Sequence, residues 1–251
     1  MPPTPTGTPS PTPTPLPTET PPPPTPTALS PEVMAKIDSI LSTYARQNIF
    51  SGSVLIGQRG NVLLSQGYGL ADRAQVIPST AQTRYRIASI TKQFTAMAIL
   101  ILQSQGKLDV QDGVCDYFKD CPPAWQAMTL EHLLTHSSGI PFPPEPVDAP
   151  HWWATPTAPD QLIARFKDLP LEFQPGENYR YTNNGYVVLG YVIEQVTGQT
   201  YAEFLQQTIL TPLGLTDTGY ETPSDSLAVG YPDGFVSYPV DIVDSSIVYA
   251  A

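Results

Sequence analysis

Residues 86–106 read RIASITKQFTAMAILILQSQG. The mainly apolar run after Lys92 predicts a long buried helix over residues 89–105, ended by Gly106. Positions three apart share one face of a helix, so Ser89 and Lys92 can meet in its first turn. A buried helix would hold both side chains in fixed positions, as a nucleophile and its base require.

The Ser89–Lys92 pair suits nucleophilic catalysis. A partly buried lysine ammonium can lose its proton and act as base for the serine hydroxyl. The helix N-terminus also favours the negative charge that develops in acyl transfer. Alone the pattern is weak, because Ser104 and Lys107 repeat the spacing where Gly106 breaks the turn. The alternative is a helix cap beside a surface lysine.

A second segment contains Tyr181 and Asn183, which follow Pro-Gly-Glu at residues 175–177. A phenol beside a cation can ionise or shuttle protons. The Asn183 amide can donate to a substrate carbonyl and accept from Lys92. The alternative is a tyrosine-rich loop in which Asn183 caps the next helix.

The third segment, residues 133–141, reads LLTHSSGIP. It places His136 next to Ser137 and Ser138, which invites a serine–histidine interpretation. We interpret His136 as structural instead, because no acidic residue is placed locally to orient its ring.

The remaining sequence predicts how the chain divides into a linker and a domain. Residues 1–28 are rich in Pro and Thr, which favours extended polyproline II and predicts a disordered linker or stalk, or a plain disordered terminus. Residues 29–251 are expected to form one domain, opened by a helix that starts at Ser30 and Pro31. Two β-rich runs, residues 53–57 and 62–64, predict a hairpin around a turn at residues 59–61.

Three later helices are predicted from apolar spacing and end signals: residues 160–168, residues 184–196 before Gly198, and a helix opened by a capping box at residues 200–203. A Pro-rich loop spans residues 137–160. Its aromatic residues 151–153 (His-Trp-Trp) could border a cleft, or serve in the core or on the surface. Cys115 and Cys121 could form a disulfide or stay as two thiols.

Composition excludes several classes of protein. The net charge of -11, from 12 basic and 23 acidic residues, disfavours nucleic acid as a partner. No apolar run is long enough for a membrane span, and two cysteines cannot make a structural zinc site. No phosphate-binding loop, dinucleotide fingerprint, metalloprotease motif or hydrolase elbow occurs. We expect no cofactor and no metal, and a small-molecule or peptide substrate.

Taken together, the three segments resemble the class C β-lactamases and the serine hydrolases related to penicillin-binding proteins. Ser-x-x-Lys, Leu-Leu-Thr-His-Ser-Ser-Gly and Pro-Gly-x-x-x-x-Tyr-x-Asn occur in the family's order, and the resemblance covers residues 31–251. It implies an α/β (α+β) fold: an antiparallel sheet flanked by helices, plus a mostly helical region, with the serine in the cleft between. The substrates it implies are β-lactams, D-amino-acid peptides such as cell-wall peptides, or small esters.

The resemblance also implies a role for each site residue. Ser89 matches the nucleophile that becomes acylated, and Lys92 the partner that activates it. Tyr181 matches the base and proton shuttle, and Asn183 the contact to the substrate amide. The expected cycle is attack by Ser89, formation of an acyl-enzyme and hydrolysis by water.

One family motif is not found. No Lys-Thr-Gly or His-x-Gly follows Tyr181. We therefore expect a chain that lacks the last strands of the sheet and is poorly soluble or inactive alone. The second function hypothesis is a non-catalytic cell-surface binding or assembly module with the same fold. The tail predicts an extracytoplasmic protein, secreted, periplasmic or surface-tethered, whose export signal lies outside these residues; the alternative is a protein that stays inside the cell.

Overall fold

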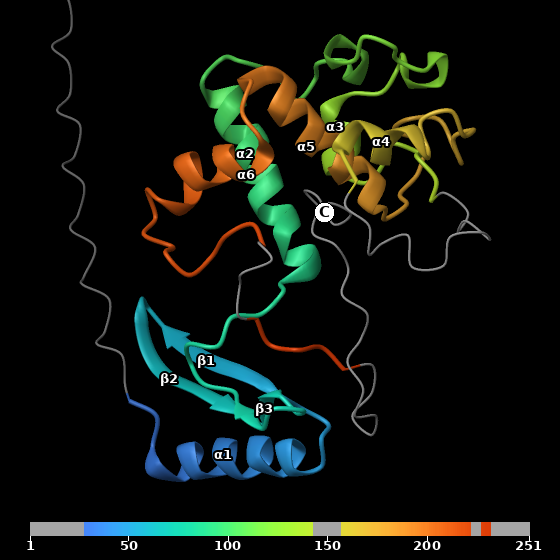
Figure 1. The fold of residues 1–251 in the computed structure, drawn as a ribbon. Coiled ribbons are helices and arrows are strands. Elements are labelled where there is room, and N and C mark those ends of the chain that lie inside the picture. Colours follow the sequence, from blue (N-terminus) through green and yellow to red (C-terminus); the bar gives the residue numbers. More distant parts are fainter. Residues whose placement is uncertain (1–27, 143–156, 222–226, 232–251) are drawn as a thin grey trace, which may run out of the picture.

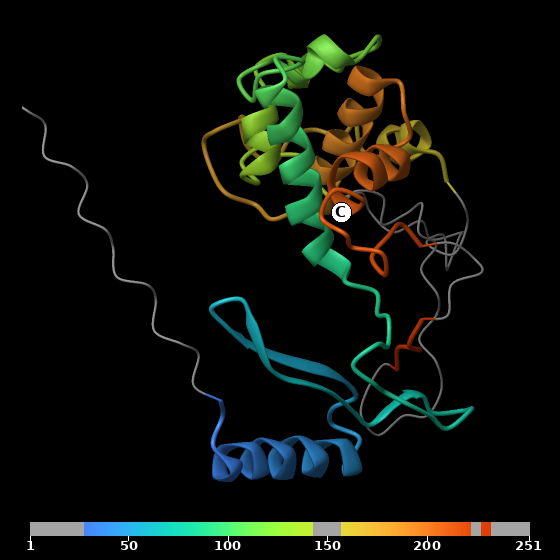
Figure 2. The same cartoon turned by 90° about the vertical axis from the view of Figure 1, so that its left-hand side faces the viewer.

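The computed structural model describes residues 28–142, 157–221 and 227–231. Residues 1–27 of the predicted linker, the aromatic residues 151–153 and the chain after residue 231 lie outside the described residues, so expectations about them stay predictions. Figures 1 and 2 show a mostly helical part, a β-hairpin below it, and helix α1 on the far side of the hairpin. This mixture of helices and short antiparallel strands agrees with the predicted fold class.

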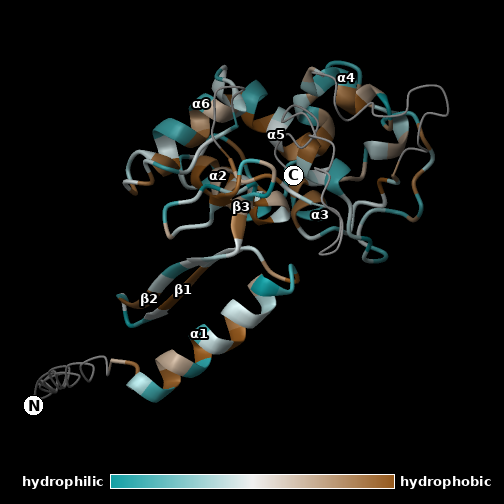
Figure 3. Ribbon diagram, turned by 60° about the horizontal axis from the view of Figure 1, so that its bottom comes forward, coloured by the Kyte–Doolittle hydropathy of each residue, from teal (hydrophilic) through white to brown (hydrophobic). Residues whose placement is uncertain are grey.

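Helix α1, Pro31–Arg46, starts where the sequence predicted. The Ser30 side chain accepts a hydrogen bond from Val33 N at 3.3 Å, and Pro31 occupies the first turn. These two residues supply an acceptor for an orphan N–H and a preset backbone angle. The helix lies next to strand β2, and Figure 3 shows apolar and polar residues alternating along it.

Strands β1, Gly52–Gln58, and β2, Asn61–Tyr68, form the predicted antiparallel hairpin. Arg59 and Gly60 make the turn, with φ of 52° and 76°. Positive φ at both positions matches the right-handed twist of the flanking strands. The predicted turn was one residue too long, since Asn61 already pairs with Gln58, and both strands run beyond the predicted apolar runs.

A second small antiparallel sheet follows, made of β3, Leu70–Asp72, and β4, Ile77–Pro78. Residues 227–231 return to this region: Val229 N donates to Ala71 O at 2.8 Å, and Ala228 N donates to Arg84 O at 2.9 Å. The strands of the described residues all come from residues 52–78, while a segment 150 residues later lies beside them.

The helical part is built around α2, Thr91–Ser104, and α5, Asn183–Thr197. Figure 3 shows α5 as mainly apolar. The fully buried side chains of these two helices include Ile99, Leu102, Val188, Leu189 and Ile193. Burial of side chains of this size supplies most of the favourable free energy of folding. The two packed helices therefore form the centre of the helical part, and their first turns hold the residues predicted to form the site.

The shorter helical elements surround that centre. They are η2 (Val114–Tyr117), η3 (Pro123–Trp125), α3 (Leu130–Leu134), α4 (Pro159–Ala164), α6 (Tyr201–Leu205) and the π-helical turn η5 (Gln206–Leu210). The helix predicted over residues 160–168 is shorter, as α4, and the one predicted over residues 184–196 is longer, as α5. The predicted end signal at Gly198 is confirmed, since Gly198 caps α5 with φ of 67°. The capping box of Thr200 and Glu203 is confirmed as well.

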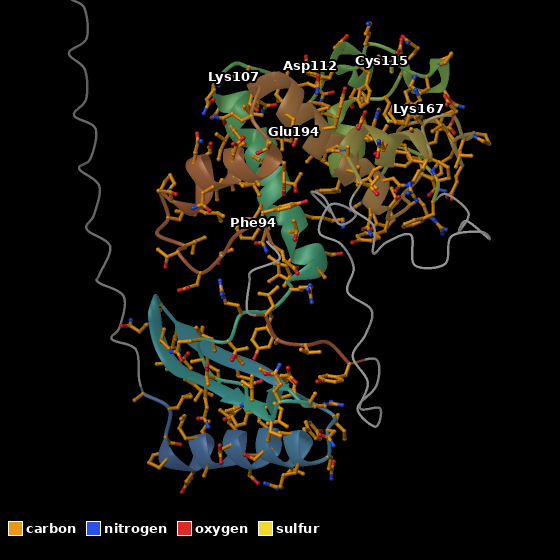
Figure 4. The ribbon with its side chains drawn as sticks, in the orientation of Figure 1. Phe94, Lys107, Asp112, Cys115, Lys167 and Glu194 are labelled. Carbon is orange, nitrogen blue, oxygen red and sulfur yellow. A yellow bond between two sulfur atoms is a disulfide. The ribbon has the colours of Figure 1, made fainter. Side chains whose placement is uncertain are left out.

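Cys115 and Cys121 form a disulfide, which decides between the two predicted states. It lies at the end of the helical part away from the hairpin; Figure 4 shows Cys115 there and Phe94 at the opposite end of α2. Among the described helices, none combines the length and apolar character needed to cross a membrane.

Candidate active site

Ser89 is the middle residue of a short 3₁₀ turn, η1 (Ala88–Ile90), that runs directly into α2. The predicted single helix is therefore two elements, with Ser89 just outside the α-helix. Ala88, immediately before it, has a φ of 46°, which a residue with a side chain adopts only at a cost. The turn presents Ser89 at the surface, at the end of α2 that faces the hairpin.

Lys92 is buried, with 7% of its surface exposed. Its Nζ donates to Asn183 Oδ1 at 2.8 Å and lies 3.4 Å from Ser89 Oγ. It also lies over the rings of Tyr181 and Tyr186, 4.9 Å and 5.4 Å from their centroids. A buried ammonium needs such partners to offset its lost hydration. Lys92 is therefore not a surface lysine. Its hydrogen bond to Asn183 links α2 to α5 beside Ser89.

Tyr181 lies two residues before α5, and its hydroxyl donates to Ser89 Oγ at 2.7 Å. Burial alone would raise the pKa of this phenol. Hydrogen bonding with Lys92 and Ser89 and the positive charge of Lys92 outweigh burial and lower that pKa. Once the phenol is ionised, the hydrogen bond reverses and the serine hydroxyl donates to the phenolate. The pair can therefore pass a proton in either direction.

Asn183 is the first residue of α5, and the residue before it provides the helix cap. The Thr182 side chain accepts from Asn184 N at 3.2 Å. The alternative in which Asn183 caps the helix is therefore wrong. Its amide oxygen instead accepts from Lys92 and fixes that side chain beside the serine.

The structure brings together the four residues predicted from sequence: Ser89, Lys92, Tyr181 and Asn183. Ser89 and Tyr181 lie just before α2 and α5, and Lys92 and Asn183 lie in the first turns of these helices. Packing of the two helices aligns these ends. A hydroxyl in contact with both a phenol and an ammonium can lose its proton as it attacks a carbonyl. The arrangement fits nucleophilic acyl transfer.

His136 lies against the site, which sequence analysis did not foresee. Its ring centroid is 4.6 Å from that of Tyr181 and 5.2 Å from that of Tyr186. The neighbouring serines do not pair with it: Ser137 Oγ contacts Thr135 Oγ1 at 2.8 Å, and Ser138 Oγ accepts from Ile140 N at 3.4 Å. The resemblance includes this segment as a motif but implies no role for the imidazole. A contact across 45 residues of sequence leaves no local spacing that could reveal it.

Within residues 28–142, 157–221 and 227–231, no three His, Cys, Asp or Glu side chains lie close enough together to hold a metal ion.

Comparison with protein families gives a match to the Beta-lactamase family over residues 36–229. Penicillin-binding protein 4* of Bacillus subtilis strain 168 is 31% identical over 185 residues, covering 72% of this chain and 40% of the relative.

Two solved structures extend the comparison. The D-amino acid amidase from Ochrobactrum anthropi SV3, solved with L-phenylalanine amide, is 28% identical with a TM-score of 0.70, covering 87% of this chain and 63% of that one. EstCE1, a hydrolase with promiscuous acyltransferase activity, is 27% identical with a TM-score of 0.69, covering 83% and 59%. The chain thus spans between 40% and 63% of the length of these three proteins.

Proposed function

Because the chain belongs to the β-lactamase family, we propose that it is a serine hydrolase that forms an acyl-enzyme at Ser89. One observation carries the proposal: Ser89 Oγ lies 2.7 Å from the Tyr181 hydroxyl and 3.4 Å from Lys92 Nζ. Related hydrolases include an amidase and an acyl-transferring hydrolase. The proposed substrates are β-lactams, D-amino-acid peptides or small esters.

In the proposed first step, Ser89 Oγ attacks the carbonyl carbon of the substrate, and its proton passes to Tyr181. The lowered pKa of Tyr181 makes the phenolate accessible as a base. Tyr181 then gives this proton to the leaving nitrogen or oxygen as the bond from the carbonyl carbon to that atom breaks. The Lys92 ammonium stabilises the phenolate, and the product of the step is an ester on Ser89.

In the second step a water molecule attacks the ester carbonyl, and Tyr181 accepts its proton. The bond to Ser89 Oγ breaks, the proton returns to the serine, and the carboxylic acid leaves. Asn183 serves both steps by holding Lys92 through the 2.8 Å hydrogen bond. Tyr181 thus acts as base and acid in turn, as microscopic reversibility requires.

Apolar side chains near Ser89 support a substrate with an apolar group next to the reacting carbonyl. Ile87 and Ile90 flank the serine in sequence and are 39% and 55% exposed. Tyr179 is 65% exposed and lies on the far side of the tyrosine–histidine contact, with its ring 6.1 Å from that of His136. Exposed large apolar groups beside a reactive centre gain free energy when a ligand covers them. These side chains favour an acyl group that carries an aromatic side chain, such as that of the phenylalanine amide in the amidase complex.

We also propose that the protein works outside the reducing cytoplasm. The Cys115–Cys121 disulfide supports this, because such bonds persist mainly in oxidising compartments. A disulfide that forms equally during cytoplasmic expression in a reducing host would contradict this placement.

The experiment for the proposed function is covalent labelling of the full-length protein with a fluorophosphonate. The account predicts that wild type is labelled and that Ser89→Ala is not. Ser104→Ala is the matched control, since Ser104 precedes a lysine at the same spacing but bonds Ile101 O at 2.7 Å. Equal labelling of wild type and Ser89→Ala would overturn the proposal. Folded wild type that takes no label would favour the non-catalytic binding module.

A further inference from the structure

His136 is bonded to the main chain on both sides of Tyr181. Its carbonyl oxygen accepts from Arg180 N at 2.8 Å, and its Nδ1 accepts from Thr182 N at 3.4 Å. Between these two bonds its ring packs on the Tyr181 ring at 4.6 Å. His136 thus contacts Tyr181 and both neighbours in sequence.

We propose that neutral His136 is a positioning residue that holds the Tyr181 hydroxyl on Ser89, and that protonation of its Nδ1 releases Tyr181 and switches acylation off. This inference rests on the proposed function, since it concerns the same site. His136 acts through Tyr181, because among the hydrogen bonds of the described residues it makes none to Ser89 or to the Tyr181 hydroxyl.

The backbone at His136 shows that this placement is specific. Its φ of 57° lies in the left-handed region, which a residue other than glycine adopts only where the surroundings compensate. The compensating contacts are the hydrogen bonds to Arg180 and Thr182 and the ring contacts. Gly139, three residues after His136, also has a positive φ, at 75°. A Cβ at this position would collide with the Phe173 carbonyl. The loop is therefore fixed on both sides of its two serines.

A hydrogen bond accepted at Nδ1 requires the neutral tautomer that carries its proton on Nε2. If Nδ1 gains a proton, two donors face each other at Thr182, and the bond is lost. The new charge would also lie near the buried ammonium of Lys92. Protonation therefore opposes two features of the site at once.

The groups around the imidazole favour the neutral form. Those that titrate are Lys92 from α2, Tyr179 and Tyr181 from the segment before α5, and Tyr186 from α5. Lys92 is the cation among them. Burial first, and the charge of Lys92 second, lower the pKa of His136 and outweigh the backbone contact with Thr182, which acts in the opposite direction. The unfolded chain takes up this proton near the ordinary histidine value of about 6.5, so the free energy of unfolding falls as the pH drops below that value. In the folded protein the site itself changes only as the pH approaches the lowered pKa of His136.

Two substitutions separate the hydrogen bond from the ring contact. His136→Asn keeps an acceptor near the place of Nδ1, tolerates positive φ and does not titrate in this range. His136→Phe keeps a ring but removes the acceptor. His132→Asn is the matched control: the same change four residues upstream, where the imidazole caps α3 by accepting from Thr129 N at 3.1 Å.

The test measures the rate of acylation of the full-length protein by a fluorescent penicillin as a function of pH, with the fraction folded measured at each pH. We expect the acylation rate of the folded protein to fall below pH of about 6.5 in wild type and in His132→Asn. His136→Asn should lack this fall. His136→Phe should be about 10- to 100-fold slower at neutral pH, as for a misplaced catalytic group. An unchanged acid loss in His136→Asn, or a wild-type rate in His136→Phe, would overturn the inference.

Nitrogen NMR of the imidazole in folded Ser89→Ala separates this inference from the proposed function, because it needs no catalysis. We expect His136 to carry its proton on Nε2 at neutral pH and to titrate below the ordinary histidine range. That tautomer in a folded protein that neither a penicillin nor a fluorophosphonate modifies at Ser89 would refute the proposed function together with the switching role. Acylation at Ser89 with the proton of His136 on Nδ1 would refute the inference and leave the proposed function intact.

Discussion

The Tyr181 hydroxyl lies 2.7 Å from Ser89 Oγ, although 92 residues separate the two in sequence. The contact depends on α2 and α5 packing so that their first residues meet, and Lys92 joins the same ends through Asn183. The proposed chemistry needs this one contact for proton transfer. It is also the contact that His136 is proposed to hold in place.

Tyr181→Phe removes the hydroxyl and keeps the ring against His136. We predict that acylation of Ser89 becomes about 100- to 10,000-fold slower, the range for loss of a general acid–base group. Thermal unfolding should change little, because 41% of the Tyr181 surface is exposed. The measurement is the rate of labelling by a fluorescent penicillin. A variant that labels at the wild-type rate would remove Tyr181 from the mechanism.

Lys92→Met removes the charge that faces Tyr181. In wild type the pKa of Tyr181 is lowered, so its phenolate should appear at a lower pH than that of an ordinary tyrosine. Without Lys92, burial dominates and the pKa of Tyr181 should rise. The test is the tyrosinate absorbance of each protein minus that of its Tyr181→Phe counterpart. Identical difference titrations with and without Lys92 would show that the ammonium does not control the phenol.

Asn183→Ala leaves the buried Lys92 ammonium without the acceptor at 2.8 Å. An unsatisfied buried donor costs about 1–3 kcal/mol, so the free energy of unfolding should fall by that amount, and acylation should slow as Lys92 moves. Asn183→Asp restores an acceptor and should recover the stability. Chemical denaturation measures both variants. Equal stability of Asn183→Ala and wild type would mean that this hydrogen bond contributes nothing net.

The Cys115→Ser, Cys121→Ser double variant opens a loop at the end of the helical part away from the hairpin. A short loop of this kind predicts a loss of about 2 kcal/mol in the free energy of unfolding. Labelling at Ser89 should be unaffected once the protein is folded, because Cys115 lies at the opposite end of the helical part from the start of α2. Denaturation and labelling at one temperature check both parts. A folded variant that no longer labels would reveal coupling between this loop and the site.

Local features of the fold could be predicted from sequence because their causes are local. Ser30 and Pro31 start α1, Gly198 ends α5, and the capping box at Thr200 starts α6, each through bonds within a few residues. The observed ends of strands and helices differ from the predicted ends where contacts with other parts of the chain determine them. Asn61 joined β2 because pairing with Gln58 completes the hairpin, and a 3₁₀ turn replaced the first turn of the predicted helix at Ser89.

The site was predictable in part. Ser89 and Lys92 are close because they lie three residues apart, which spacing alone can show. Their contacts with Tyr181 and Asn183 depend on the packing of two helices, so the sequence suggested them only through the order of motifs. The lack of an acidic residue close to His136 in sequence predicts only a structural role. The contacts of His136 are instead a tyrosine ring and main-chain groups brought close by folding.

The most direct test of the account is mass spectrometry of the full-length protein after exposure to a penicillin. The account predicts a mass increase of one penicillin per chain, located on the peptide that contains Ser89 and not formed by Ser89→Ala. An adduct on another residue, or an equal mass increase in Ser89→Ala, would contradict the claim that Ser89 is the nucleophile.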